Sequence, residues 1–111
     1  MQLETTFRNV SARPEVKTRA EHLFAKLEKF LDPAATGHLI VSAEHGKVIL
    51  EIVVKAAGGT YVAKEEDEEL RNALDLVFHT IENQLRRAKD RKRSHRERGP
   101  DDEFGGGEAT A

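Results

Sequence analysis

Residues 39–63, LIVSAEHGKVILEIVVKAAGGTYVA, contain the clearest strand and turn signals in the chain. Its apolar runs at 39–43 and 48–56 predict two strands, and the turn between them, Glu44-His45-Gly46-Lys47, offers a glycine for positive φ. A second turn at 57–60 leads into a shorter strand at 61–63, which gives way to an acidic run. Short turns make neighbouring strands antiparallel, so we expect a three-stranded meander.

Two amphipathic helices flank the meander. Between Pro14 and Leu31 the apolar residues follow steps of three and four, and Asp32-Pro33 ends the pattern because proline cannot continue a helix. From Leu70 to Ala88 the same period runs for five turns. The acidic run 65–69 is expected to open this second helix, and cations follow its end, as the helix dipole favours.

Residues 2–8 alternate between apolar and polar side chains, which predicts a first strand with one buried face. The expected order is therefore β-α-β-β-β-α, an α+β fold. The long crossover makes the first two strands parallel, so the four-stranded sheet is mixed. Both helices are expected on one face of that sheet.

A chain of 111 residues and 12.4 kDa allows one domain, which we assign to residues 1–98. Residues 99–111 are acidic and rich in glycine, and we expect them to be a disordered tail. The chain has no cysteine and no apolar run long enough to cross a bilayer, and we do not expect its first residues to form a signal peptide. These features predict a soluble cytoplasmic protein without a membrane partner.

Charge is segregated along the chain. Residues 1–85 hold 10 basic and 14 acidic side chains, residues 86–98 hold 8 and 2, and residues 99–111 hold 0 and 4. The middle segment, RRAKDRKRSHRER, repels itself unless an anion neutralises it, and phosphate is the usual candidate. A solvated helix end is the alternative interpretation.

Cations also form rows along both predicted helices. Arg19, His22, Lys26 and Lys29 are spaced by three, four and three residues, and so are Arg86, Lys89, Arg93 and Arg96. Two such rows on adjacent helices suit a sugar-phosphate backbone better than base edges, although each row alone could be an ordinary solvated face. Outside the expected core the only aromatics are Tyr61 and Phe104, which disfavours binding by base stacking.

The sequence indicates no enzyme, metal site or cofactor. Its five histidines lack zinc-ligand spacing, and there is no P-loop, GxGxxG or GxSxG motif. The acidic run 65–69 is explained more simply as helix-terminal charge than as a cation site.

Several short motifs carry a resemblance to a known family over about residues 1–93. They are Arg8-Asn9-Val10, the segment LFAKLEKF at 23–30, Leu70, Ala73-Leu74-Asp75, Gln84-Leu85 and Lys89-Asp90. In these the chain resembles the ribosome hibernation promoting factor family, which includes ribosome-associated inhibitor A and was formerly called sigma-54 modulation protein. The family's β-α-β-β-β-α fold agrees with the order expected from periodicity.

The resemblance implies a translation inhibitor that occupies the decoding region of the small ribosomal subunit, in the space of messenger RNA and of the A- and P-site transfer RNAs. Its partners would be the small subunit with 16S ribosomal RNA and the whole ribosome, not DNA, and off the ribosome it would be monomeric. The resemblance places RNA contacts at Lys26, Lys29, Arg86, Arg87, Lys89, Arg91 and Lys92. Arg19 and Arg93 join them from the two cationic rows.

The sequence departs from the family pattern at three positions. Arg71 stands where an aromatic is common, and Thr80 and Asn83 stand at usually basic positions. We expect no second, ribosome-pairing domain. Two kinds of short family member then remain, one that promotes ribosome dimers and one that prevents them. The acidic tail fits the second kind by its length. The alternatives are a general double-stranded RNA-binding module and a protein-interaction regulator.

Overall fold

The computed structural model describes residues 1–98, with side chains described to residue 91. The elements are β1 (Gln2–Phe7), α1 (Pro14–Ala25), a 3-10 helix η1 (Lys26–Phe30), β2 (Thr36–Glu44), β3 (Lys47–Ala56), β4 (Gly59–Asp67) and α2 (Leu70–Arg98). The expected order and the α+β class are confirmed. The tail assigned to 99–111 lies outside the described residues.

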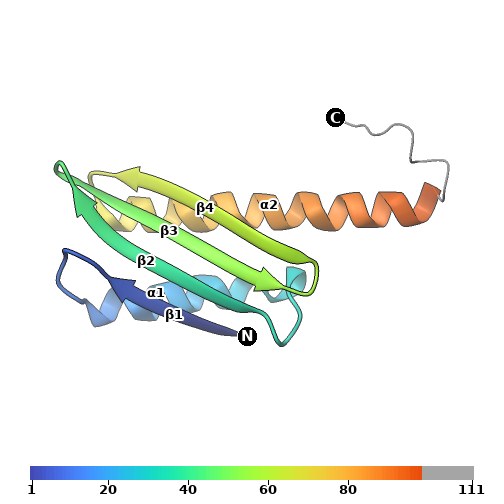
Figure 1. Ribbon diagram of the computed structural model, residues 1–111, viewed down its shortest axis with the longest axis horizontal. Coiled ribbons are helices and arrows are strands. Elements are labelled where there is room, and N and C mark those ends of the chain that lie inside the picture. Colours follow the sequence, from blue (N-terminus) through green and yellow to red (C-terminus); the bar gives the residue numbers. More distant parts are fainter. Residues whose placement is uncertain (99–111) are drawn as a thin grey trace.

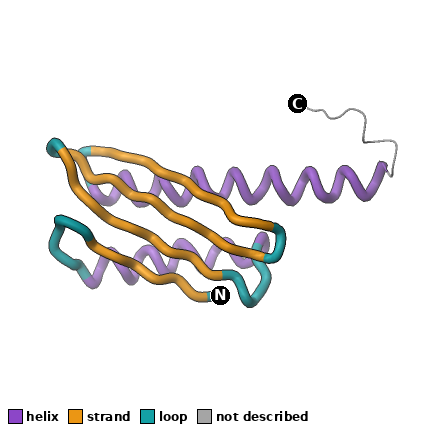
Figure 2. The backbone as a smooth tube through the Cα atoms, viewed as in Figure 1, coloured by secondary structure: helices purple, strands orange, loops and turns teal. Residues whose placement is uncertain are grey.

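The four strands form one mixed sheet in the order β1-β2-β3-β4. β1 runs parallel to β2, and the two hairpins are antiparallel, as the connection lengths predicted. At the first hairpin His45 (φ 53°) and Gly46 (φ 78°) both have positive φ, the requirement of the tight turn that matches strand twist. Both helices cover the same face of the sheet (Figures 1 and 2).

The core lies between the sheet and the helices. Alternate residues of the central strands, among them Leu39, Leu50 and Ile52, are completely buried against Phe24 of α1 and Ile81 of α2. Burying each such side chain contributes about 1.5–3 kcal/mol. The opposite sheet face has no helical cover, and there Val62 keeps 46% of its surface exposed.

The first helix is shorter than expected. The period predicted a helix from Pro14 to Leu31, but α1 ends at Ala25 and the chain tightens into η1 before Leu31 takes an extended conformation. The residue before a proline avoids the α conformation, so the chain has to leave the helix ahead of Asp32-Pro33. In a 3-10 turn residues three apart are eclipsed, which places Leu27 and Phe30 on the same side.

The acidic run was assigned wrongly. β4 continues to Asp67, so Glu65, Glu66 and Asp67 belong to the strand and not to the opening of α2. Alternation sends Glu65 toward the helices, where it accepts a hydrogen bond from Thr80 Oγ1 at 2.7 Å. Glu66 lies 4.0 Å from Lys47 of β3. Pairing with β3 along the whole register decides the conformation here, against the low strand propensity of acidic residues.

Helix α2 is longer than its apolar stripe. It runs to Arg98 and carries the basic segment beyond the edge of the sheet (Figure 1). Near its middle, Gln84 Nε2 donates to the carbonyl of Val62 at 2.8 Å, and so satisfies a backbone group of the edge strand β4. The first half of α2 thus packs on the sheet, and the basic residues lie in its second half.

Asp32 ties the loop after η1 to the turn between β3 and β4. Its carboxylate accepts hydrogen bonds from the backbone N–H of Ala57 at 3.0 Å and of Ala34 at 3.2 Å. These bonds, that of Ala57 most of all, hold the pKa of Asp32 below its ordinary value of 3.8. The loop and the turn therefore form one wall beside the end of η1.

The charge of Asp32 makes this wall sensitive to acid. Because its pKa is lower in the folded state, its contribution to stability is complete above pH 3.8 and disappears as the pH falls through the lower folded value. We expect Asp32→Asn to lower the melting temperature at pH 7, and the difference from wild type to shrink below pH 3.8. Thermal unfolding followed by circular dichroism from pH 2 to pH 7 measures this. A difference that stays constant down to pH 2 would contradict it.

Candidate nucleic-acid interface

Three cations surround the ring of Phe30. Lys29 Nζ lies 5.4 Å from the ring centroid, Lys89 Nζ 5.6 Å and Arg86 Cζ 5.7 Å. Each is within cation–π range, so the ring holds three like charges together that would otherwise separate. We call Lys29, Arg86 and Lys89 the cationic cluster.

The cluster joins residues up to 60 positions apart in the sequence. Lys89 Nζ donates to the carbonyl oxygen of Lys29 at 3.4 Å, so the last turn of η1 is held against α2. Phe30 is only half-buried and forms the floor between the two elements. The end of η1 and the middle of α2 together build one surface.

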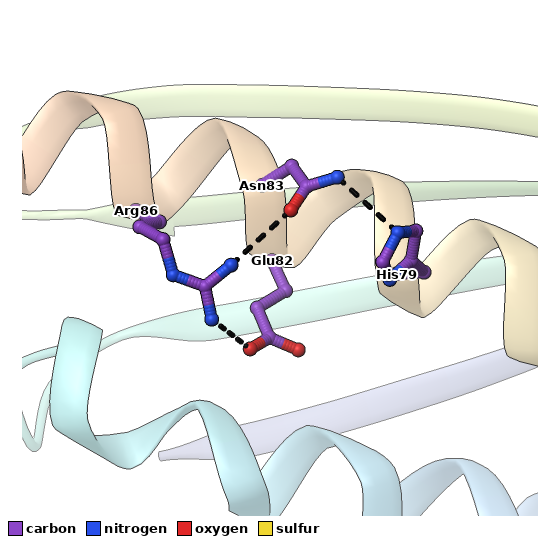
Figure 3. Close-up of polar contacts among 4 residues, drawn as sticks. All are labelled: His79, Glu82, Asn83 and Arg86. Atoms are coloured by element: carbon purple, nitrogen blue, oxygen red, sulfur yellow. Dashed lines mark hydrogen bonds and ion pairs between the residues drawn. The ribbon is translucent and has the colours of Figure 1, made fainter.

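Only one cation of the cluster is neutralised within the described residues. Arg86 donates to Glu82 Oε2 at 2.7 Å and to Asn83 Oδ1 at 3.2 Å, and Asn83 in turn contacts His79 Nε2 at 3.4 Å (Figure 3). Lys29 and Lys89 form no ion pair with a described carboxylate. The cluster therefore has unbalanced positive charge at an exposed position.

Arg19 is placed apart from the cationic cluster. Its guanidinium pairs with Asp75 Oδ1 of α2 at 2.9 Å, and its Nε is buried without a hydrogen-bond partner. Arg19 therefore links α1 to α2 instead of continuing a row of available cations. Sequence spacing could not show this, because Asp75 is 56 positions away.

The other candidate cations lie near the cluster along the chain. Lys26, Arg87 and Arg91 are all exposed. Lys92 and Arg93 follow on the same helix, but their side chains lie outside the described residues. Eight of the nine candidate positions are thus at η1 or the second half of α2, and Arg19 is the exception.

An open groove of about 590 Å³ runs along one side of the cluster. Its floor is apolar and its rim carries Lys29, Lys89 and Arg91. The wall is the turn held by Asp32. The lining residues are Lys29, Phe30, Asp32, Ala56, Ala57, Gly58, Tyr61, Leu85, Ala88, Lys89 and Arg91, and we call this hollow the Phe30 groove. Phe30, expected in the core, does pack against it but stays half-buried. Its contacts with α2 cannot be seen from sequence spacing, because Lys89 is 59 positions away.

Neither a metal site nor a membrane span is found in the part of the chain that the structure describes. Among residues 1–91, whose side chains are described, no group of three or more is placed to hold a metal ion. The helices within residues 1–98 include none long and apolar enough to cross a bilayer. What the described surface offers is charge and a shallow apolar hollow.

Comparison with known proteins identifies the family. A model of the family described as sigma 54 modulation protein / S30EA ribosomal protein matches residues 3–93. The chain belongs to this family. Within the sigma 54 modulation/S30EA family, it is 27% identical over 95 residues to the ribosome hibernation promoting factor of Klebsiella oxytoca, covering 86% of this chain and 100% of that protein. Its identity to the ribosome hibernation promoting factor of Salmonella typhimurium is 26%, with the same coverage.

Solved structures share the fold. A ribosomal subunit interface protein from Coxiella burnetii superposes with a TM-score of 0.71 at 24% identity, covering 81% of this chain and 99% of that one. The N-terminal domain of Protein Y from Thermus thermophilus gives a TM-score of 0.73 at 26% identity, covering 78% and 98%. The mixed sheet with two helices is therefore an architecture that this chain shares with both proteins.

Two of the three departures from the family pattern take part in hydrogen bonds within the fold. Thr80 binds Glu65 of β4, and Asn83 binds both Arg86 and His79. Arg71 is exposed beside Arg13, at the end of α2 away from the cationic cluster. In this sigma 54 modulation/S30EA member, two positions expected to be basic thus carry polar bonds within the fold.

Proposed function

We propose that this chain is a ribosome hibernation factor that binds the small ribosomal subunit and reversibly prevents translation. Two curated relatives of the same family carry the name ribosome hibernation promoting factor, and a protein of the same fold is described as a ribosomal subunit interface protein. In this proposal the chain acts in the cytoplasm as a monomer until it meets a ribosome. It has no catalytic role.

The observation that carries the proposal is the cationic cluster on Phe30. Lys29 and Lys89 have no carboxylate partner among the described side chains, and the basic second half of α2 continues their charge. An exposed surface of this kind is neutralised well by closely spaced phosphates, which release their own counterions on binding. It reads the backbone and not the base sequence.

The proposed contact residues follow from this surface. They are Lys26, Lys29, Arg86, Arg87, Lys89, Arg91, Lys92 and Arg93, facing 16S ribosomal RNA in the decoding region. Arg19 contributes by holding α1 against α2 through Asp75. Inhibition is steric, since a bound domain fills the space of messenger RNA and of the A- and P-site transfer RNAs.

Co-sedimentation with ribosomes tests the proposal. The purified chain is layered with small subunits and with whole ribosomes on sucrose gradients at low and moderate salt, with and without transfer RNA. Saturable one-to-one binding that transfer RNA displaces is expected. Binding to any double-stranded RNA with equal affinity would favour a general RNA-binding module, and no binding at low salt would favour a protein-interaction regulator. A ribosome-dimer peak, or its absence, distinguishes the two short kinds of factor.

Glu82 is expected to lower the affinity of the cationic cluster for RNA in the wild-type chain. Its carboxylate lies 2.7 Å from Arg86, so a phosphate has to compete with it for the guanidinium. We expect Glu82→Gln to raise the affinity for small subunits by about threefold to tenfold at low salt, since one more cation becomes available. Filter binding across a salt series measures the change. Glu21→Gln removes the same charge from α1 and should leave affinity almost unaltered; equal gains from both variants would assign the effect to net charge alone.

A further inference from the structure

The Phe30 groove combines two chemistries. Its rim is cationic at Lys29, Lys89 and Arg91, whereas its floor is formed by apolar and aromatic side chains that include Phe30, Tyr61 and Leu85. A sugar-phosphate backbone matches the rim but not the floor. The matching ligand is an acidic segment that carries a large apolar side chain.

One acidic side chain lines the groove, but its charge is already engaged. Both oxygens of Asp32 accept backbone N–H groups, at 3.0 Å from Ala57 and 3.2 Å from Ala34. These bonds hold the carboxylate in the wall of the groove. The rim cations are left to face a ligand from outside.

The chain itself contains a segment with this composition. Residues 99–111 hold 4 acidic and 0 basic side chains, and three of the acids, Asp101, Asp102 and Glu103, directly precede Phe104. Three glycines follow, so the aromatic carries no bulky neighbour on that side. Asp-Asp-Glu-Phe thus complements both the rim and the floor.

The spacing along the chain allows the two to meet. From Ala88, at the groove, to Arg98 the helix rises about 15 Å at ~1.5 Å per residue. The six residues from Gly99 to Phe104 span up to about 20 Å when extended. Pro100 cannot continue the helix, which suits a reversal of direction at this point. An extended segment of this length therefore reaches the part of the groove beside Ala88.

We propose that Asp101–Phe104 docks in the Phe30 groove of its own chain, with its carboxylates at Lys29, Lys89 and Arg91 and the Phe104 ring on the apolar floor. The segment and the groove belong to one molecule, so the effective concentration is in the millimolar range and weak contacts suffice. The bound segment covers part of the cationic cluster, so it competes with RNA. That competition rests on the function proposed above, whereas the docking does not.

A spin label tests the docking directly. The chain has no cysteine, so Gly106→Cys gives a single site for a nitroxide. In the full-length ¹⁵N-labelled chain we expect strong broadening of the amide signals of Ala57, Gly58 and Lys89. The broadening should vanish in 1 M salt, where the Debye length is about 3 Å.

Matched variants identify the groups responsible. Asp101→Asn/Asp102→Asn/Glu103→Gln should abolish the broadening at Ala57 and Gly58, and Phe104→Ser should reduce it several-fold. Glu108→Gln, the control for the remaining acid, should preserve it. Broadening confined to the end of α2, or unchanged in the triple variant, overturns the proposal. Broadening that appears only when labelled and ¹⁵N chains are mixed assigns the contact to a second copy and also overturns it.

Ribosome binding separates this proposal from the proposed function. If the acidic segment docks in the groove, the triple variant should bind small subunits about threefold to tenfold more tightly than wild type at low salt. This difference should disappear at high salt. Broadening at the groove without ribosome binding in either chain means that the segment docks and the proposed function is wrong. Equal ribosome binding by both chains without broadening means that docking is wrong and the function stands.

Discussion

Affinity for the small ribosomal subunit falls by at least about a hundredfold at 0.1 M salt when Lys29, Lys89 and Arg91 are replaced together by glutamine. Each of these cations lies at the rim of the Phe30 groove, and neither lysine has a described carboxylate partner to take up the lost charge. Each phosphate contact removed also lowers the slope of log affinity against log salt by about 0.7–0.9. Filter binding or gradient co-sedimentation across a salt series measures both quantities.

A charge-matched control makes this result specific. Lys47, Lys55 and Lys64 are exposed on β3 and β4, on the sheet and away from the helical surface. Their replacement by glutamine removes the same three charges and should alter affinity less than about threefold, because long-range effects are screened at this ionic strength. Equal losses from the two triple variants would show that only net charge matters. The melting temperature of the rim variant should stay close to wild type, since surface substitutions change stability by about 0.5 kcal/mol or less.

Leu50→Ala is expected to destabilise the domain by about 2–5 kcal/mol. Leu50 lies on the central strand β3, is completely buried and packs into the layer between sheet and helices. Its truncation removes apolar burial and leaves a cavity that the surrounding strands cannot close. For a domain of this size each kcal/mol corresponds to about 4–8 °C in melting temperature, so thermal unfolding should show a fall of about 10 °C or more.

Val62→Ala is the matched control on the other face of the same sheet. Val62 is 46% exposed, so its truncation should cost well under half as much as that of Leu50. A comparable loss at both positions would mean that the uncovered face is as important to stability as the helical one. Folded Leu50→Ala protein, assayed well below its melting temperature, should still bind ribosomes, because its cations are unaltered.

Much of the fold could be predicted from local pattern. The order of the elements followed from the turn residues around His45-Gly46 and from the helical period of Leu70–Ala88. The lengths of the connections predicted which strands are parallel. The errors fell where tertiary contacts override local preference. Residues 65–67 became strand because β3 offers a full ladder of partners, and the first helix tightened at Lys26 ahead of Asp32-Pro33.

The candidate site could be predicted only in part. Basic residues at the end of α2 were evident from the sequence, since eight cations occur within residues 86–98. The spacing of Arg19 to Lys29 suggested a continuous row, yet Arg19 is paired with Asp75. Phe30 packs against the core as expected, but its ring also contacts three cations. Neither contact has a local sequence pattern.

The order of the elements, the mixed sheet and the concentration of positive charge follow from local sequence, because they depend on the period of apolar residues, turn chemistry and net charge within short windows. Which cations are available and which are neutralised depends instead on contacts between distant elements. Lys29 and Lys89 meet across 60 positions only because η1 and α2 pack on the same face of one sheet. Energies of ion pairs and cation–π contacts depend on distances of a few ångströms, and such distances arise from the packing of the whole domain.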